Sequence, residues 1–343
     1  MPLPALHRRL FLRLLAATLA AAALAPPAHA AGVTLLNVSY DVTRVFYKEY
    51  NAAFIAHWKA TTGEAIAVNQ SHGGSSKQAR SVSDGLEADV ITMNQANDID
   101  LLAERGALIP PDWATRLPDH SAPTTSVSVI LVRKGNPKGL RDWADLARPG
   151  VGVVIPNPKT SGNGRYTYLA TWGSVIKGGG TPAQAKALVT QLFANVPVFD
   201  GGGRAATTTF AQRGIGDALV TFESEIGLIL EEFGAKDFEV VYPRRTVLAE
   251  NPVAVVDKVV DRKGTRRAAE AYLRWLWSDE GQEIAARHRL RPRSAKALAA
   301  HAADFPVLDT FTVDEVFGGW KAAQKAHFDD GGLYDQVLGA KAR

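Results

Sequence analysis

The sequence predicts an α/β fold of two lobes that close like a clamshell, each lobe a mostly parallel sheet flanked by helices. Short β-rich runs alternate with helical patterns along the chain, which is typical of parallel sheets covered on both faces. Two polar stretches that contain proline, 117–126 and 247–252, each precede a strand pattern. If the chain crosses between lobes at both stretches, it leaves the first lobe, builds the second and returns. A ligand of such a fold lies between the lobes, where strands end and helices begin.

These two crossings set the expected domain boundaries. Residues 31–122 together with 252–343 form the first lobe, and residues 123–251 form the second, with the two crossover strands as a hinge. A chain of 343 residues, 46% of them hydrophobic, is long enough for two domains with sizeable cores.

Hydrophobic periodicity predicts the individual elements. In the first long helix, over residues 42–58, the apolar residues Phe46, Tyr50, Phe54 and Trp58 recur at every fourth position and form one stripe. Further helices are expected over 75–86, after Ser161, after Gly203 and over 265–288. Strands are expected at 33–40, 65–70, 89–93, 127–132, 152–155, 196–199, 218–221, 239–242 and 253–256.

The pattern of residues 1–30 is typical of an export signal that is cleaved from the mature chain. Three arginines precede a run of leucine and alanine, and Ala28 and Ala30 form the small-x-small pattern of a cleavage site. The apolar run over 14–25 is too short to cross ~30 Å of hydrocarbon, so the protein is not expected to be inserted in a membrane. The pair Arg8 and Arg9 leaves open whether export follows the general or the twin-arginine route. We expect the mature chain in the periplasm, with secretion as the alternative.

Composition excludes several classes of function. The chain has 39 basic and 35 acidic residues, and three of the basic residues lie in the predicted signal, so the mature chain is nearly neutral. No basic patch interleaved with aromatic residues indicates nucleic-acid binding. The absence of cysteine excludes disulfides, thiolate chemistry and lipidation of a mature N-terminal cysteine. The histidines outside the signal show no ligand-like spacing, so no metal and no other cofactor is expected.

Four helix starts share one chemistry. Each follows a strand, contains small residues and leaves backbone N–H groups unpaired at the positive end of a helix, which suits an anion. The four are Ser39–Asp41, His72–Lys77, Asn157–Ala170 (NPKTSGNGRYTYLA) and Asp200–Arg204. Two belong to the predicted first lobe and two to the second, so closing the clamshell would bring them together. For each turn the alternative stays open that its small residues only cap their own helix.

These turns offer many hydrogen-bond donors and few acceptors. Asp41 and Asp200 are the only acids in them, and each can be explained as a cap for its own helix. Hydrogen phosphate carries a proton that needs an acceptor, whereas sulfate is fully ionised and only accepts hydrogen bonds. The turns therefore favour a sulfate-like anion. Lys77, Arg165 and Arg204 are expected near the site without necessarily touching the ligand.

These segments resemble the periplasmic sulfate- and thiosulfate-binding proteins that feed ABC importers. The similarity covers nearly the whole chain after the signal and is carried by LLNVSYDVTR (35–44), QSHGGSSKQA (70–79), LVRKGNPK (131–138), PNPKTSGNGRYTYLA (156–170), GGRAATTTFAQRGIGD (202–217) and FGGWKAAQKAHF (317–328). The resemblance implies a type II periplasmic binding protein that is not an enzyme. It also implies sulfate or thiosulfate as ligand, the permease of an importer as partner and a monomeric state.

In that family, backbone N–H groups at helix starts and a few side chains hold the anion. The resemblance assigns backbone N–H contacts to several positions and, at the serine of PKTSG, a hydroxyl contact as well. Carried over to this sequence, the site consists of Asp41, Ser75, Ser161, Gly162, Asn163, Gly203 and Phe222.

Phe222 departs from the sulfate-binding members. They have a tryptophan there whose indole N–H reaches the anion, in a segment that reads LVTFESE here (219–225). The thiosulfate-binding branch has phenylalanine, and the chain is closest to that branch. An apolar ring suits the larger sulfur of thiosulfate, which accepts hydrogen bonds poorly. An ordinary core position for Phe222 is the alternative, and the preference between the two anions is left open.

Two other functions stay open. Another tetrahedral oxyanion, such as molybdate, tungstate or phosphate, would suit similar donors. An esterase or sulfatase would use Ser75 or Ser161 as nucleophile, which requires an adjacent base. His72 is the only histidine in the four turns, and the chain has no GxSxG elbow.

Overall fold

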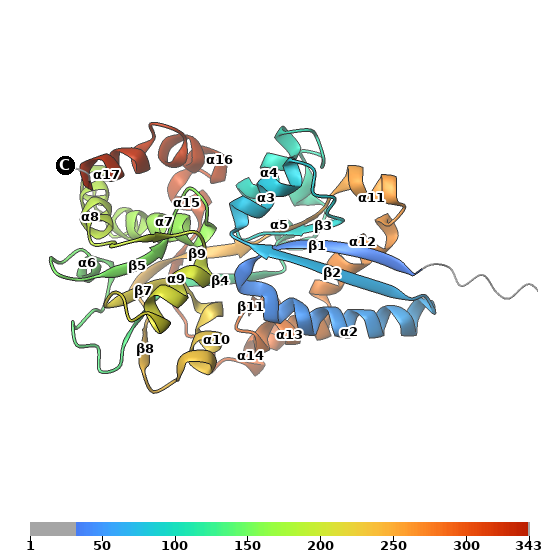
Figure 1. Cartoon of the computed structure of the whole chain (residues 1–343), viewed down its shortest axis with the longest axis horizontal. Helices are drawn as coiled ribbons and strands as arrows, with labels where there is room; N and C mark the ends of the chain where they lie inside the picture. The colour runs from blue at the N-terminus through green and yellow to red at the C-terminus, as the bar shows by residue number, and fades with distance from the viewer. Residues whose placement is uncertain (1–31, 342–343) are drawn as a thin grey trace, which may run out of the picture.

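The computed structural model describes residues 32–341, which form two lobes side by side (Figure 1). The predicted export signal lies outside these described residues. Between residues 32 and 341, no helix is long and apolar enough to cross a membrane. The α/β class and the two-lobe architecture predicted from the sequence are confirmed.

The first lobe contains a four-stranded sheet in the order β10-β3-β1-β2. Strand β1 (Val33–Tyr40) is parallel to β2 (Ile66–Gly73) and to β3 (Val90–Thr92), whereas β10 (Val253–Val255) is antiparallel to β3. The longer helices of this part of the chain are α2 (Arg44–Thr62), α3 (Ser75–Ser83), α4 (Ala96–Glu104), α11 (Asp257–Lys263), α12 (Arg266–Arg274) and α13 (Asp279–Arg287). Shorter helices are η1 (Asp41–Thr43), η2 (Trp113–Thr115), α5 (Pro118–Ser121) and η4 (Trp275–Trp277).

Helix α2 confirms the predicted apolar stripe. The four aromatic residues of the stripe are buried and pack with Tyr272 and Trp275 into one core cluster against the sheet. The helix ends at Gly63, whose φ of 73° is the left-handed conformation that glycine adopts without strain. A second cluster, to which α3 and α4 contribute, includes Val38 and Ile91 of the sheet. Helices therefore cover both faces of the first sheet.

The second sheet is mixed, which corrects the expectation of a mostly parallel sheet. Its order is β12-β9-β4-β7-β5-β6, and the long strand β4 (Thr124–Arg133) is antiparallel to all its partners. One reason is topological: β4 enters the lobe and β9 (Arg245–Asn251) leaves it beside β4, so the two must run in opposite directions. The remaining strands are β5 (Val153–Pro156), β6 (Phe199–Asp200), β7 (Ala218–Phe222), β8 (Phe238–Val241), β11 (Arg291–Pro292) and β12 (Asp309–Phe311).

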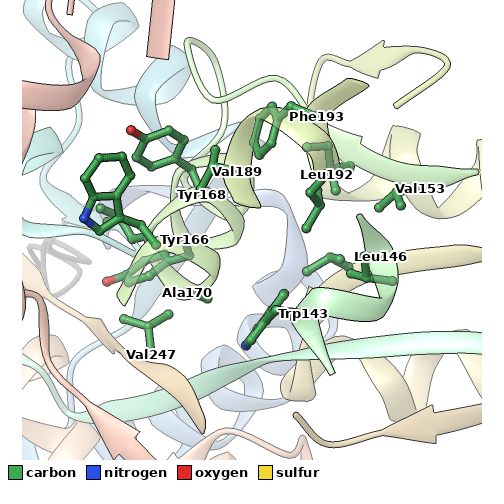
Figure 2. Close-up of a cluster of buried hydrophobic side chains, with 14 of the residues drawn as sticks. Trp143, Leu146, Val153, Tyr166, Tyr168, Ala170, Val189, Leu192, Phe193 and Val247 are labelled. Carbon is green, nitrogen blue, oxygen red and sulfur yellow. The ribbon is translucent and has the colours of Figure 1, made fainter. Parts of the chain in front are cut away.

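A central helix, α7 (Gly162–Lys177), organises the core of the second lobe. Every residue of α7 from 162 to 173 is buried. Figure 2 shows Tyr166, Tyr168 and Ala170 of α7 in the same cluster as residues of α8 (Pro182–Ala194) and α6 (Trp143–Leu146). The other helices of this lobe are α9 (Gly203–Thr207), its π-helical continuation η3 (Thr208–Gln212) and α10 (Glu223–Phe233).

Two crossings between the lobes lie side by side. Thr124, at the start of β4, is opposite Asn251, at the end of β9, and the Asn251 Nδ2 donates to the Thr124 Oγ1 at 3.0 Å. Pro252 separates β9, in the second sheet, from β10, in the first. Both crossings fall within the stretches that the sequence singled out.

The C-terminal segment differs from the expected division, which placed all of 252–343 in the first lobe. The chain returns to the second sheet in a third crossing: β11 pairs with the start of β4, and after α14 (Ala295–Ala300) β12 pairs in parallel with β9. Phe328 and Tyr334 then pack around Tyr168 in the core of the second lobe. These aromatic residues cover apolar surface of α7 and α8 that would otherwise face water. The helices of the segment are α15 (Val313–Phe317), α16 (Trp320–Ala323), η5 (Gln324–Phe328) and α17 (Leu333–Lys341).

Candidate functional site

The four predicted helix starts meet at one place between the lobes. A Cβ atom built on Gly74, which precedes α3, would lie 2.8 Å from the carbonyl oxygen of Thr160 and 3.2 Å from that of Gly201. A Cβ atom on Gly202 would lie 2.9 Å from the Oδ2 of Asp41. The first-lobe starts at Asp41 and α3 therefore contact the second-lobe starts at α7 and α9. The lobes are in contact around the site.

Backbone N–H groups at this place have no acceptor. Ser75, Gly162 and Gly203 are the first residues of α3, α7 and α9, and Asn163 is the second of α7. Within residues 32–341, the backbone N–H groups of these four residues donate no hydrogen bond. Unpaired N–H groups at converging helix starts form a region of positive potential without a cationic side chain. The arrangement can hold a small anion by hydrogen bonds alone.

Ser161 has a free hydroxyl at the start of α7, whereas its backbone N–H is already paired. It is the N-cap of α7, with an extended backbone (φ −133°, ψ 131°), and is 3% exposed. Its side chain does not cap α7, and its backbone N–H donates to the carbonyl oxygen of Asn157 at 2.9 Å. The hydroxyl is therefore the free donor of this residue in the described chain.

Asp41 connects the two lobes through its side chain. Its Oδ2 accepts a hydrogen bond from the backbone N–H of Arg204 at 3.3 Å. Burial raises the pKa of this carboxyl, and the hydrogen bond from Arg204 opposes that effect. The carboxylate lies at the start of α9 in the other lobe, which the interpretation as a cap for its own helix did not foresee.

The basic side chains near the site are held by other groups. The Arg165 Nη1 lies 4.0 Å from the Asp98 Oδ1, and the guanidinium of Arg204 pairs with Glu232. Lys77 lies in the first turn of α3 and is exposed. The charge of a bound anion would therefore be balanced mainly by backbone dipoles.

Phe222 lies behind the helix starts, at the end of β7. Its ring is buried and meets the ring of Tyr166 edge to face, with centroids 5.6 Å apart. The cluster that contains Phe222 also includes Tyr40 and Val42, which flank Asp41 in the first lobe. Phe222 thus belongs to a core cluster that extends across the boundary between the lobes.

Comparison with known proteins identifies the family. Residues 39–290 match the family described as bacterial extracellular solute-binding protein. The chain is 63% identical to the thiosulfate-binding protein of Pseudomonas aeruginosa over 95% of this chain and 98% of that protein. It is 53% identical to the sulfate-binding protein of Escherichia coli, over 89% of this chain and 93% of that protein. It belongs to the bacterial extracellular solute-binding proteins.

A solved structure supports the same assignment. The sulfate-binding protein SubI from Mycobacterium tuberculosis H37Rv matches with a TM-score of 0.77 and 32% identity, over 87% of this chain and 100% of that chain. The resemblance read from the sequence motifs, to sulfate- and thiosulfate-binding proteins, is thereby confirmed.

In this solute-binding protein, sequence reasoning missed a buried carboxyl at the site, that of Glu225. Its Oε2 would lie 3.3 Å from a Cβ atom on Gly203, and it accepts a hydrogen bond from the hydroxyl of Thr221. Burial and, next, the charge of Asp41 raise the pKa of Glu225 to about 7. The four turns alone hold few acceptors, but the fold adds one from α10. Its position three residues after Phe222, on the same helix start, was the signal that could have found it.

Asn94 is the second residue that sequence reasoning missed. It follows the end of β3 by two positions, is 3% exposed and lies against Gly162 from the opposite lobe. Because β3 is the neighbour of β1 in a parallel sheet, the loop after β3 must end near the loop after β1. The loop has no glycine, so it did not stand out among the helix starts. Residues 32–341 contain no group of three or more acidic or histidine side chains that could hold a metal ion.

Proposed function

We propose that this solute-binding protein captures sulfate or thiosulfate in the periplasm and delivers it to the permease of an ABC importer. The convergence of unpaired N–H groups from both lobes on one place carries the proposal. The relatives named for thiosulfate and sulfate binding support the ligand. The protein acts as a monomer without enzymatic activity, after removal of residues 1–30 as an export signal.

The ligand is held by donors from four helix starts. In the proposal, backbone N–H groups of Asp41, Ser75 and Gly203 bind the anion together with those of Gly162 and Asn163. The hydroxyl of Ser161 is the side-chain donor of the second lobe. Hydrogen bonds to a dianion are strong in a site from which closure excludes water.

Phe222 is proposed to face one corner of the ligand. A buried aromatic ring offers no hydrogen-bond donor, so the corner it faces suits the terminal sulfur of thiosulfate better than an oxygen. The edge-to-face contact with Tyr166 holds the ring in place. We therefore propose a preference for thiosulfate over sulfate.

Titration calorimetry on the ligand-free mature chain tests the function. Sulfate, thiosulfate, phosphate and molybdate are titrated separately, and the two sulfur anions are expected to bind most tightly. Tighter binding of phosphate or molybdate than of either sulfur anion would contradict the proposal.

One observation favours a second candidate, hydrogen phosphate. The Glu225 carboxyl near Gly203 could accept the proton that this anion carries. The same titration decides between the two, because a site that uses Glu225 as acceptor would bind phosphate more tightly than sulfate.

Hydrolysis by a serine nucleophile has little support in the geometry. The Ser75 hydroxyl donates to the sulfur of Met93 at 3.3 Å, and within residues 32–341 neither Ser75 nor Ser161 is hydrogen-bonded to a histidine. A nucleophilic serine needs such a base. Release of phenol from an aryl sulfate that is abolished by Ser161→Ala would overturn the non-enzymatic proposal.

A further inference from the structure

Asn94 is a buried carboxamide without a hydrogen-bond partner at the contact between the lobes. Its Oδ1 is buried and has no partner, and within residues 32–341 its side chain makes no hydrogen bond. Buried polar groups in native proteins are nearly always paired, so an unpaired one needs an explanation. A ligand that completes the pairing is one such explanation.

The carboxamide lies directly against the start of α7. A Cβ atom built on Gly162 would lie 2.0 Å from the Asn94 Oδ1 and 2.9 Å from its Nδ2. On its other side, the backbone N–H of Asn94 approaches the Ser75 Oγ at 3.5 Å. Asn94 therefore sits between the start of α3 in the first lobe and the start of α7 in the second.

This position explains why α7 begins with glycine. Any side chain at position 162 would occupy the space that Asn94 fills, so the two lobes could not approach this closely. The glycine leaves the first N–H groups of α7 accessible to a small group held between the lobes. Asn94 is a polar side chain from the first lobe that reaches this start.

We propose that Asn94 binds the anion directly. Its Nδ2 donates a hydrogen bond to an anion oxygen when the lobes close. The inference rests on the proposed function, because it assigns to Asn94 a contact with that ligand. A carboxamide can turn about its Cβ–Cγ bond, so its NH₂ group can face an anion that lies between the lobes. Asn94 and Ser161 are then the two side-chain donors, one from each lobe.

The test uses three variants and calorimetry with sulfate and thiosulfate. Asn94→Ala removes the donor. It is expected to raise the dissociation constants of both anions by about tenfold or more, as expected for the loss of a hydrogen bond to a charged group. Asn94→Asp keeps the shape but replaces the donor by a like charge, so it is expected to bind more weakly than Asn94→Ala. Thermal unfolding of each ligand-free variant shows whether it is folded.

Asn97→Ala is the matched control. The Asn97 Nδ2 donates to the Gln324 Oε1 at 3.3 Å, so this asparagine also connects the first lobe to the C-terminal segment on the second lobe, but away from the helix starts. Its dissociation constants are expected to stay within about twofold of wild type. A loss in Asn97→Ala equal to that in Asn94→Ala would reduce Asn94 to a contact between lobes and overturn the inference.

Two further outcomes separate this inference from the proposed function. If wild-type protein binds the anions and Asn94→Ala binds them equally well, or if Asn94→Asp binds as well as Asn94→Ala, the inference is wrong and the function stands. If wild-type protein binds neither sulfur anion, the proposed function is wrong and the inference falls with it.

Discussion

Helix starts at the contact between the lobes and helix starts at the surface have similar residues but different hydrogen bonds. Ser278 and Ser294, the N-caps of α13 and α14, accept hydrogen bonds from the backbone N–H groups of Gly281 and Ala297 at 3.0 and 3.3 Å. Ser161 is also an N-cap with an extended backbone, but its hydroxyl does not cap α7. A serine at a helix start is thus compatible with capping or with binding, and the packing around it decides which.

The third helical residue separates the starts at the contact from three other helices, although not from α13 and α14, where it is Gly281 and Ala297. Three helices of the second lobe and C-terminal segment, α6, α8 and α15, begin with complete capping boxes, in which a side chain at this residue accepts a hydrogen bond from the backbone N–H of the N-cap residue. The pairs are Asp142 with Asp145, Thr181 with Gln184 and Thr312 with Glu315. At α3, α7 and α9 the same position holds Lys77, Gly164 and Ala205, which cannot accept such a bond. These starts therefore lack the local means to satisfy their own N–H groups.

Glu232 at the surface and Glu225 at the contact between the lobes differ in the direction of their pKa shifts. This difference gives the largest expected effect, a change in the free energy of unfolding with pH. At the surface, the hydrogen bond from Arg204 lowers the pKa of Glu232, whereas burial raises the pKa of Glu225 to about 7. A raised pKa means that the stabilising contribution of the protonated carboxyl is complete below pH 4.5 and is lost as the pH rises through about 7. The loss corresponds to about 3 kcal/mol of unfolding free energy, at 1.36 kcal/mol per pH unit.

Urea unfolding of ligand-free protein at pH 5 and pH 8 measures this loss. The free energy of unfolding of wild type relative to Glu225→Gln is expected to fall between the two pH values by about 2.5 kcal/mol, because part of the loss has already occurred at pH 5. Glu232→Gln, compared with wild type in the same way, is expected to show no such fall. A wild-type curve parallel to that of Glu225→Gln would mean that the Glu225 carboxyl is not buried in the ligand-free state.

Ser161→Ala and Ser278→Ala compare the two kinds of serine directly. Ser161→Ala is expected to weaken anion binding by about 2 kcal/mol, because a hydrogen bond to a charged ligand is lost, with little change in stability. Ser278→Ala is expected to lower stability by about 1 kcal/mol, because a cap is lost, with unchanged affinity. Calorimetry and urea unfolding of both variants check the pair, and the reverse pattern would contradict the assignment of Ser161 to the ligand.

Gly74→Ala tests how closely the lobes must approach. The added methyl group would lie 2.8 Å from the carbonyl oxygen of Thr160, a backbone atom of the other lobe, so the lobes cannot come together without a shift. Overpacking of this kind costs about 1–3 kcal/mol, and we expect about 1.5 kcal/mol to appear as lost affinity. Gly201→Ala in the neighbouring turn is the control, because a methyl group there meets nothing within 4 Å. Equal affinities of the two variants would show that closure does not need the contact at Gly74.

Phe222→Trp is expected to have the smallest effect. An indole N–H at this position adds a donor, so the ratio of the two dissociation constants should move toward sulfate, on the order of threefold or about 0.7 kcal/mol. The ratio of the dissociation constants is the informative quantity, because any overpacking by the larger ring weakens the binding of both anions alike. An unchanged ratio, measured by calorimetry, would place the Phe222 ring outside the pocket.

Local patterns in the sequence predicted the parts of the fold that depend on neighbouring residues. The stripe of α2 and the helix starts at Ser75, Ser161 and Gly203 are set by residues within a few positions of one another. The assignment of the C-terminal segment was wrong because β12 has only three residues and its partner β9 lies about sixty positions earlier. No local pattern marks such a pairing.

The candidate site was predictable to the extent that its atoms belong to the backbone of these starts. Asn94 and Glu225 were missed because tertiary packing, rather than sequence spacing, brings them to Gly162 and Gly203. The roles of the predicted residues in binding stay predictions until the titrations above are made.

The third crossing has a consequence for how the chain folds during synthesis. The first sheet needs β10, and the core of the second lobe includes Phe328, Tyr334 and Val337 near the end of the chain. The first sheet therefore cannot be completed before β10 has been made, and the core of the second lobe cannot be completed before residues 328–337 have been made. The first lobe, unlike a domain that is continuous in sequence, cannot fold to completion before the strands β4 to β9 of the second lobe have been made. The partly synthesised chain exposes the α7 and α8 surfaces until the C-terminal helices arrive.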